Sequence, residues 1–243
     1  MTDSKRIAGR RAADQVQSGT LVGLGTGSTV FFTLERLGER IRDEGLEIRG
    51  LPTSKDTETK ARGFGIPLTS LETVEQLDLT IDGADEIDGA FRMIKGGGGA
   101  LLREKVVASL SKRVIIIVHA AKVVENLGTT FALPIELVPF ARAPIARSLK
   151  ALGCNPLLRV DQNGQPYHTD NGNEILDCAF EGGIADPEAL ALALAGIPGI
   201  VESGLFLGLC DQVIIGHENG EVTTREWEGS AGKDFPDREQ AAH

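Results

Sequence analysis

The chain has 243 residues, of which 35 are acidic and 25 basic, giving a formal net charge of −10. At about 150 residues per domain, this length corresponds to one or two domains and is enough to bury a core. The negative charge argues against a general nucleic-acid binder, which must neutralise phosphate backbones. A hydrophobic fraction of 41% and a charged fraction of 25% exclude disordered and collagen-like chains.

Cysteine usage and apolar runs indicate a protein of the cytoplasm. Cys154, Cys178 and Cys210 are odd in number and widely spaced, so we interpret them as buried small hydrophobic residues rather than disulfide partners. The polar N-terminus lacks the apolar stretch of a secretory signal, and the apolar run 114–118 is too short to cross a bilayer. We therefore expect a cytoplasmic protein without a membrane partner.

Strand-like and helix-like patterns alternate through the first half of the chain. Short apolar runs predict strands at residues 20–24, 46–51, 77–81 and 113–119. Apolar residues at helical spacing predict helices at residues 3–17, 30–42, 55–62 and 100–111. This alternation predicts an α/β fold with a Rossmann-like, doubly wound parallel sheet.

The order of the elements changes after residue 128. Strands are expected at 135–139, 156–160, 174–180 and 201–207, with helices at 145–152 and 187–195. The β-α-β-β-α-β order is typical of a ferredoxin-like α+β unit. Residues 213–216 read as a strand that returns to the first sheet, followed by a hairpin turn at 218–221.

The small unit is therefore predicted to be an insertion in the larger one. We assign residues 1–128 and 209–243 to the Rossmann-like domain and residues 129–208 to the ferredoxin-like domain. From about residue 226 the composition predicts a frayed tail.

The first candidate site is the sequence GLGTGST at residues 23–29, between a strand and a helix. Free backbone N–H groups and the helix dipole favour an anion there, and Thr26, Ser28 and Thr29 offer hydroxyl donors for one terminal phosphate. The spacing is not GxGxxG, and the next strand ends without an acid for a ribose hydroxyl, which weakens a dinucleotide interpretation. The alternative is a purely structural turn.

The second candidate site is an acidic segment at the end of the third strand. Asp82, Asp85, Glu86 and Asp88 fall within seven residues. They could bind a metal ion, bind sugar hydroxyls or form a solvated turn. A metal is the poorer interpretation, because no histidine lies near and the next motif brings Lys95 rather than further oxygen ligands.

The third candidate site is KGGGGALLREK at residues 95–105. Four consecutive glycines are expected where the backbone passes close to a ligand, although a flexible linker is the alternative. Glu104 falls about one turn into the following helix, where a glutamate commonly complements the dipole. The four histidines have no ligand spacing and are interpreted as incidental: His119, His168, His217 and His243.

These motifs resemble those of the ribose-5-phosphate isomerase family of the A type. The matching segments are GTGST at 25–29, TS at 53–54, DGADEID at 82–88, KGGGGALLREK at 95–105, AAK at 120–122 and TDNGN at 169–173. The resemblance implies interconversion of ribose 5-phosphate and ribulose 5-phosphate through an enediolate, in the pentose phosphate pathway. It implies no cofactor and a homodimer or homotetramer. From the net charge and the residue pattern above, we expect no nucleic-acid partner and no metal.

The resemblance also assigns roles to individual residues. Glu104 resembles the general base, and Asp82, Asp85 and Lys95 resemble the rest of the catalytic set. Lys5 is a weaker candidate for the phosphate. The implied substrate-binding residues are Thr26, Gly27, Ser28, Thr29, Asp82, Gly83, Ala84, Asp85, Lys95, Gly96, Gly97, Gly98 and Lys122. The departures are a fourth glycine, Gly99, where some relatives have alanine, and an extended tail after Arg225.

Three other functions stay open from the sequence. A sugar-phosphate sensing module would share the fold, although only about 19 residues precede the first strand, too few for the helix-turn-helix that such regulators carry. A relative of glucosamine-6-phosphate isomerase/deaminase is a second alternative. A nicotinamide oxidoreductase is the third, and it requires NAD(P) binding by the GTGST loop.

Overall fold

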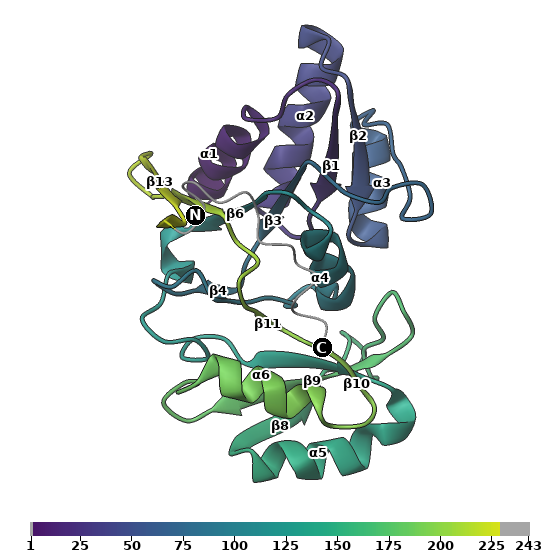
Figure 1. Ribbon diagram of the computed structural model, residues 1–243, viewed down its shortest axis with the longest axis vertical. Helices are drawn as coiled ribbons and strands as arrows, with labels where there is room; N and C mark the ends of the chain where they lie inside the picture. Colours follow the sequence, from purple (N-terminus) through teal and green to yellow (C-terminus); the bar gives the residue numbers. More distant parts are fainter. Residues whose placement is uncertain (1, 229–243) are drawn as a thin grey trace.

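A six-stranded sheet lies at the centre of the larger of the two parts of the molecule (Figure 1). The structure is a computed structural model and describes residues 2–228. The strand order of this sheet is β13-β12-β6-β3-β1-β2, and all neighbours are parallel except the pair β12 and β13. The predicted parallel sheet is therefore confirmed. The strands are β1 (Thr20–Leu24), β2 (Ile48–Pro52), β3 (Leu79–Gly83), β6 (Val114–His119), β12 (Gln212–Gly216) and β13 (Val222–Glu226).

Helices cover both faces of this sheet, as a doubly wound fold requires. Ile115 and Ile117 of β6 share a buried cluster with residues of α1 and α2, whereas Ile116 and Val118 share another with residues of α4. Because both faces are covered, β6 is apolar at successive positions. The helices are α1 (Thr2–Ala13), α2 (Val30–Glu44), α3 (Lys55–Gly63) and α4 (Leu101–Ser109). The helix predicted over 3–17 thus ends earlier, at Ala13.

A second, antiparallel sheet lies at the other end of the molecule (Figure 1). Its order β10-β7-β9-β8 is that of the predicted ferredoxin-like unit, and Ile145, Leu149 and Leu194 of the two helices lie in the buried cluster that contains its strands. The domain boundaries stay a prediction. The elements are β7 (Leu133–Leu137), α5 (Arg142–Ala151), β8 (Cys154–Leu158), β9 (Glu174–Phe180), α6 (Pro187–Ala195) and β10 (Ile200–Ser203).

A third sheet of three short strands was not expected. It comprises β4 (Glu86–Ile87), β5 (Met93–Ile94) and β11 (Leu205–Phe206) in the order β11-β5-β4. The prediction of one strand over 201–207 is therefore wrong, because the chain changes sheets at Gly204. Gly204 N–H donates to Pro134 O, Lys95 N–H donates to Gly204 O, and a Cβ on Gly204 would lie 2.4 Å from Lys95 O.

The remaining expectations for the described residues are met in part. Cys154, Cys178 and Cys210 are buried free thiols. Of the tail expected from residue 226, Glu226 lies in β13 and Trp227 N–H donates to Asp211 O, while residues 229–243 lie outside the described part. Within residues 2–228 no helix combines the length and apolar character needed to span a bilayer.

Two glycine substitutions test this packing in opposite directions. A Cβ on Gly23 would lie 1.9 Å from Thr80 Oγ1 and 2.7 Å from Val107 Cγ1, whereas a Cβ on Gly63 in α3 meets no atom within 4 Å. We expect Gly23→Ala to lower the free energy of unfolding by about 1–3 kcal/mol through overpacking. Gly63→Ala should raise it by about 0.5 kcal/mol, because alanine favours the helix. Chemical denaturation measures both, and equal effects would contradict the packing described.

Candidate active site

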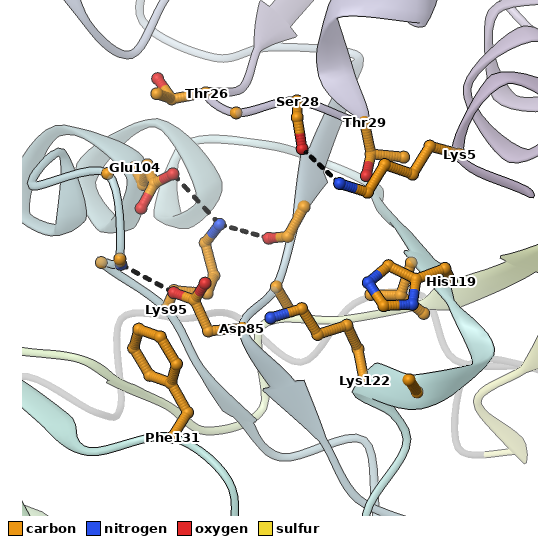
Figure 2. Close-up of a pocket in the computed structure, with 18 of the residues that line it drawn as sticks. Lys5, Thr26, Ser28, Thr29, Asp85, Lys95, Glu104, His119, Lys122 and Phe131 are labelled. Carbon is orange, nitrogen blue, oxygen red and sulfur yellow. Dashed lines mark hydrogen bonds and ion pairs between the residues drawn. The ribbon is translucent and has the colours of Figure 1, made fainter. Parts of the chain in front are cut away.

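A pocket of about 490 Å³ opens at the carboxyl edge of the central sheet (Figure 2). Open parallel sheets place ligands at this edge. Segments at the ends of β1, β3 and β6 line the pocket, together with residues 96–98 of the glycine loop and Glu104 of α4. Of the predicted site residues, the lining contains Thr26, Gly27, Ser28, Thr29, Gly83, Ala84, Asp85, Lys95, Gly96, Gly97, Gly98, Glu104 and Lys122.

Three buried charged groups meet at one end of the pocket. Lys95 Nζ lies 3.0 Å from Asp82 Oδ2 and 3.3 Å from Glu104 Oε1, and donates to Gly83 O at 2.5 Å. The exposed fractions are 3% for Lys95, 2% for Asp82 and 4% for Glu104. Asp82 lies behind the pocket lining, so it reaches the pocket through Lys95, whereas Lys95 and Glu104 line the pocket themselves.

The arrangement prepares Glu104 to accept a proton. Burial, and after it the negative charge of Asp82, raises the pKa of Glu104 to about 8 despite the attraction of Lys95. Burial alone would lower the pKa of Lys95, but the charges of Asp82 and Glu104 raise it, so Lys95 stays an ammonium. Glu104 Oε2 is buried and has no hydrogen-bond partner among the described residues. Glu104 therefore combines a raised pKa with a carboxylate oxygen that accepts no hydrogen bond from the described residues.

Asp82 also fixes the first glycine loop. Its Oδ1 accepts the N–H groups of Thr26 at 3.0 Å and Gly83 at 2.7 Å. A Cβ on Gly25 would lie 2.1 Å from the same oxygen, so the close approach of loop and carboxylate requires glycine there. Asp82, at the end of β3, thus holds the glycine loop that follows β1 in a fixed position.

The hydroxyl of Thr26 does not join a cluster of phosphate donors, contrary to the expectation from the sequence. Thr26 Oγ1 lies 2.8 Å from Thr53 Oγ1, 2.8 Å from Ser54 Oγ and 3.1 Å from Thr57 Oγ1. Figure 2 shows this side chain apart from Ser28 and Thr29. The TS pair at 53–54 therefore anchors the loop through Thr26, and the other two loop hydroxyls, those of Ser28 and Thr29, belong to residues that line the pocket.

Cationic groups gather at the other end of the pocket. Lys5 Nζ donates to Ser28 Oγ at 2.9 Å, and Lys122 Nζ lies 5.5 Å from the centre of the Phe131 ring. His119, interpreted as incidental from the sequence, lines the pocket beside them (Figure 2). Burial and the charges of Lys122 and Lys5 lower the pKa of His119. The only sequence signal for His119 was its place between a buried strand and the AAK motif.

Thr130 and Phe131 also line the pocket, and no motif in the sequence pointed to either residue. They are held by Glu86, which is fully buried. Its carboxylate accepts the N–H groups of Gly128, Thr130 and Phe131 at 2.5–2.8 Å and the Thr130 hydroxyl at 2.7 Å. Glu86 is therefore structural rather than a ligand of the substrate.

Asp88 is structural as well. It accepts the N–H groups of Ala90 and Arg92 and pairs with the guanidinium of Arg92 at 2.7 Å. Of the four acids between residues 82 and 88, Asp85 alone lines the pocket. In the described part of the chain, no group of three or more His, Cys, Asp or Glu side chains could hold a metal ion.

Comparisons with known proteins agree with the geometry. The model of the family "Ribose 5-phosphate isomerase A (phosphoriboisomerase A)" matches residues 49–220. Ribose-5-phosphate isomerase A of Listeria innocua is 50% identical over 222 residues, covering 91% of this chain and 98% of its own. The corresponding protein of Bacillus mycoides is 49% identical over 220 residues, covering 90% and 98%.

Solved structures give the same result. Ribose 5-phosphate isomerase from Plasmodium falciparum aligns with a TM-score of 0.90 at 41% identity, covering 93% of this chain and 99% of its own. A D-ribose-5-phosphate isomerase in complex with phospho-erythronic acid aligns with a TM-score of 0.88 at 36% identity, covering 92% and 97%. The resemblance noted from the motifs is confirmed: the chain belongs to the ribose 5-phosphate isomerase A family and has its isomerase function.

Proposed function

We propose that Glu104 is the base that interconverts D-ribose 5-phosphate and D-ribulose 5-phosphate in this pocket. In the direction of the ketose, Glu104 removes the proton from C2 of the open-chain aldose and returns it to C1. The hydroxyl proton leaves O2 and a proton joins O1, so the reaction is balanced without an oxidant. The observation that carries the proposal is a buried carboxylate that lines the pocket, has a pKa near 8 and has one oxygen without a hydrogen-bond partner among the described residues.

Lys95 and the glycine loop supply the electrostatic part of the mechanism. The enediolate places negative charge on O1 and O2, and preorganised donors in a water-poor site stabilise such charge strongly. Lys95 Nζ lies beside Glu104, so an oxygen bound to it sits next to the base. Asp85, which accepts Gly97 N–H at 2.7 Å, lines the same part of the pocket and is placed to bind sugar hydroxyls.

The phosphate is proposed to bind at the cationic end. Lys5, Ser28, Thr29 and Lys122 surround that end of the pocket, and the loop 26–29 precedes the helix α2. A relative of known structure is a complex with phospho-erythronic acid, a phosphorylated sugar acid, which supports a phosphosugar ligand for this pocket. The two ends of the pocket then bind the two ends of one open-chain sugar phosphate.

The cellular setting belongs to the same proposal. We place the enzyme in the cytoplasm as a homodimer or homotetramer, on the resemblance to its family. The oxidoreductase alternative is disfavoured because hydroxyls of Thr26, Thr53, Ser54 and Thr57 occupy the end of β2 where a dinucleotide site would use an acid.

Replacing the base tests the proposal. We expect Glu104→Gln to lower kcat at least 10³-fold with little change of KM, because the neutral amide cannot accept the proton. Proton NMR of the EDTA-treated enzyme with ribose 5-phosphate in D₂O measures turnover and deuterium incorporation at carbon. Glu188→Gln, an exposed glutamate of α6, is the matched control and should leave turnover unchanged. Turnover of Glu104→Gln within tenfold of the unmodified enzyme would remove Glu104 from this role.

The raised pKa predicts the pH dependence. Since Glu104 must be ionised to act, kcat/KM should fall about tenfold for each pH unit below its pKa of about 8. Steady-state kinetics between pH 5.5 and pH 9 measure this acid limb. His119→Asn should show the same fall of kcat/KM at low pH, because the pKa of His119 is lowered by burial and by the charges of Lys122 and Lys5. An acid limb centred below pH 6 would show that Glu104 ionises as an ordinary carboxyl.

The phosphate site is tested at its cationic end. Lys122→Ala should raise KM about 10- to 100-fold with a small effect on kcat, since a charge-assisted hydrogen bond contributes about 1.5–3 kcal/mol. Ser28→Ala should raise KM less, and Lys150→Ala in α5 serves as the control. Competitive inhibition by inorganic phosphate should weaken in parallel with the rise in KM. An unchanged KM in Lys122→Ala would place the phosphate elsewhere.

A further inference from the structure

The antiparallel sheet reaches across to the glycine loop of the active site. Arg159 follows β8, and its Nη1 donates to Gly96 O at 2.8 Å and to Gly97 O at 3.3 Å. Tyr167, in the connection between β8 and β9, donates its hydroxyl to Gly98 O at 3.3 Å. Three successive carbonyl groups of the loop are therefore held by residues of the β8–β9 hairpin.

The guanidinium of Arg159 is itself fixed in place. Asp177 of β9 accepts from Arg159 Nε at 2.9 Å and from Nη2 at 2.5 Å, a two-point pair between neighbouring strands. The exposed side-chain fractions are 14% for Arg159 and 27% for Asp177. Because a paired guanidinium is planar and rigid, its remaining N–H groups point in a defined direction, which here is the glycine loop.

The direction of these carbonyl groups decides where the loop amides point. In a planar trans peptide, the C=O of one residue and the N–H of the next point in opposite directions. Gly96 O accepts from Arg159, and the N–H of the same peptide, at Gly97, donates to Asp85 Oδ2. Gly97 O faces Arg159, so Gly98 N–H faces away from it, and Gly98 lines the pocket.

One hydrogen bond inside the loop, from Gly99 N–H to Gly96 O at 2.9 Å, leaves the Gly97 and Gly98 carbonyl groups to be held from outside. Four glycines in succession lack side chains and adopt many backbone conformations, so their native arrangement is costly in entropy. Gly96 has a φ of +105° and Gly99 a φ of +76°, both in the left-handed region. Tyr167 closes over the end of the loop so tightly that a Cβ on Gly99 would lie 2.2 Å from its hydroxyl oxygen.

We propose that Arg159, fixed by Asp177, is a positioning residue of the isomerase: it holds the Gly96 and Gly97 carbonyl groups away from the pocket, so that Gly97 N–H faces Asp85 and Gly98 N–H faces the reacting oxygens. The inference rests on the proposed function, because its effect is on enediolate stabilisation. Arg159 itself stays outside the pocket lining. Its loss should therefore reduce kcat and leave binding of the phosphate unaffected.

The test compares three variants of the two arginines that pair with acids of strand β9. Arg159→Ala should lower kcat about 10- to 100-fold with KM within about threefold, somewhat less than the loss of an entire oxyanion donor. Arg159→Lys should restore kcat only in part, because an ammonium can donate to Gly96 O but cannot form the two-point pair with Asp177. Arg142→Ala is the matched control: Arg142 pairs with Glu174 of the same strand β9 at 3.3 Å, and its variant should keep full activity.

Two inhibitors distinguish a positioning role of Arg159 from a general loss of structure in the Arg159→Ala variant. Phospho-erythronic acid carries a carboxylate where the enediolate oxygens would lie, whereas inorganic phosphate probes the cationic end alone. In Arg159→Ala the inhibition constant of phospho-erythronic acid should rise by about the factor by which kcat falls, and that of phosphate should not change. Equal weakening of both inhibitors, or an equal loss of kcat in Arg142→Ala, would overturn the proposal.

The remaining outcomes are also decisive. If Arg159→Ala fails to fold, Asp177→Asn removes the two-point pair while keeping Arg159, and it should reduce kcat at constant KM. An unchanged kcat in Arg159→Ala, or in Asp177→Asn where the first variant is unfolded, overturns the inference. Turnover of the unmodified enzyme, measured in the same assay, reports on the proposed function separately.

Discussion

The site depends on one ammonium group buried between two carboxylates. Removing charges from water is costly, and a buried ion pair is tolerated only with close partners and further hydrogen bonds. Lys95 and Asp82 satisfy each other at 3.0 Å, and Asp82 also accepts two backbone N–H groups. Glu104 has no such set of partners, so burial, and after it the negative charge of Asp82, raises its pKa. A structural ion pair thereby creates a basic carboxylate in a place that water scarcely reaches.

The three groups come from different elements, and the small third sheet brings them together. Asp82 ends β3, Glu104 lies in α4, and Lys95 directly follows β5. Strand β5 is held between β4 and β11, and Gly204 accepts the Lys95 N–H where the chain passes from β10 to β11. The sheet that was not expected from the sequence is therefore the one that positions the ammonium.

The parts that could be predicted from the sequence are those with a local physical signal. Alternating apolar strands and amphipathic helices indicated the parallel sheet, and glycines beside carboxylates indicated its ligand-binding edge. Two-residue strands such as β4 have too few residues to show a period, so the third sheet left no pattern. Nor does a local pattern show that Thr26 turns its hydroxyl toward Thr53, or that Arg159 lies against Gly96, because these contacts join distant segments. His119 was missed because a histidine in a pocket has no characteristic spacing.

A pKa near 8 is compatible with an efficient base at neutral pH. At pH 7, a carboxyl with this pKa is ionised in about one molecule in ten, a modest loss. In exchange, its basicity lies far above that of an ordinary glutamate, which favours removal of a proton from carbon. The same burial that lowers the ionised fraction of Glu104 also strengthens the interaction of Lys95 with an enediolate oxygen. Because both effects arise from exclusion of water, any contact that holds the glycine loop in place along the pocket acts on the base and on the oxyanion together.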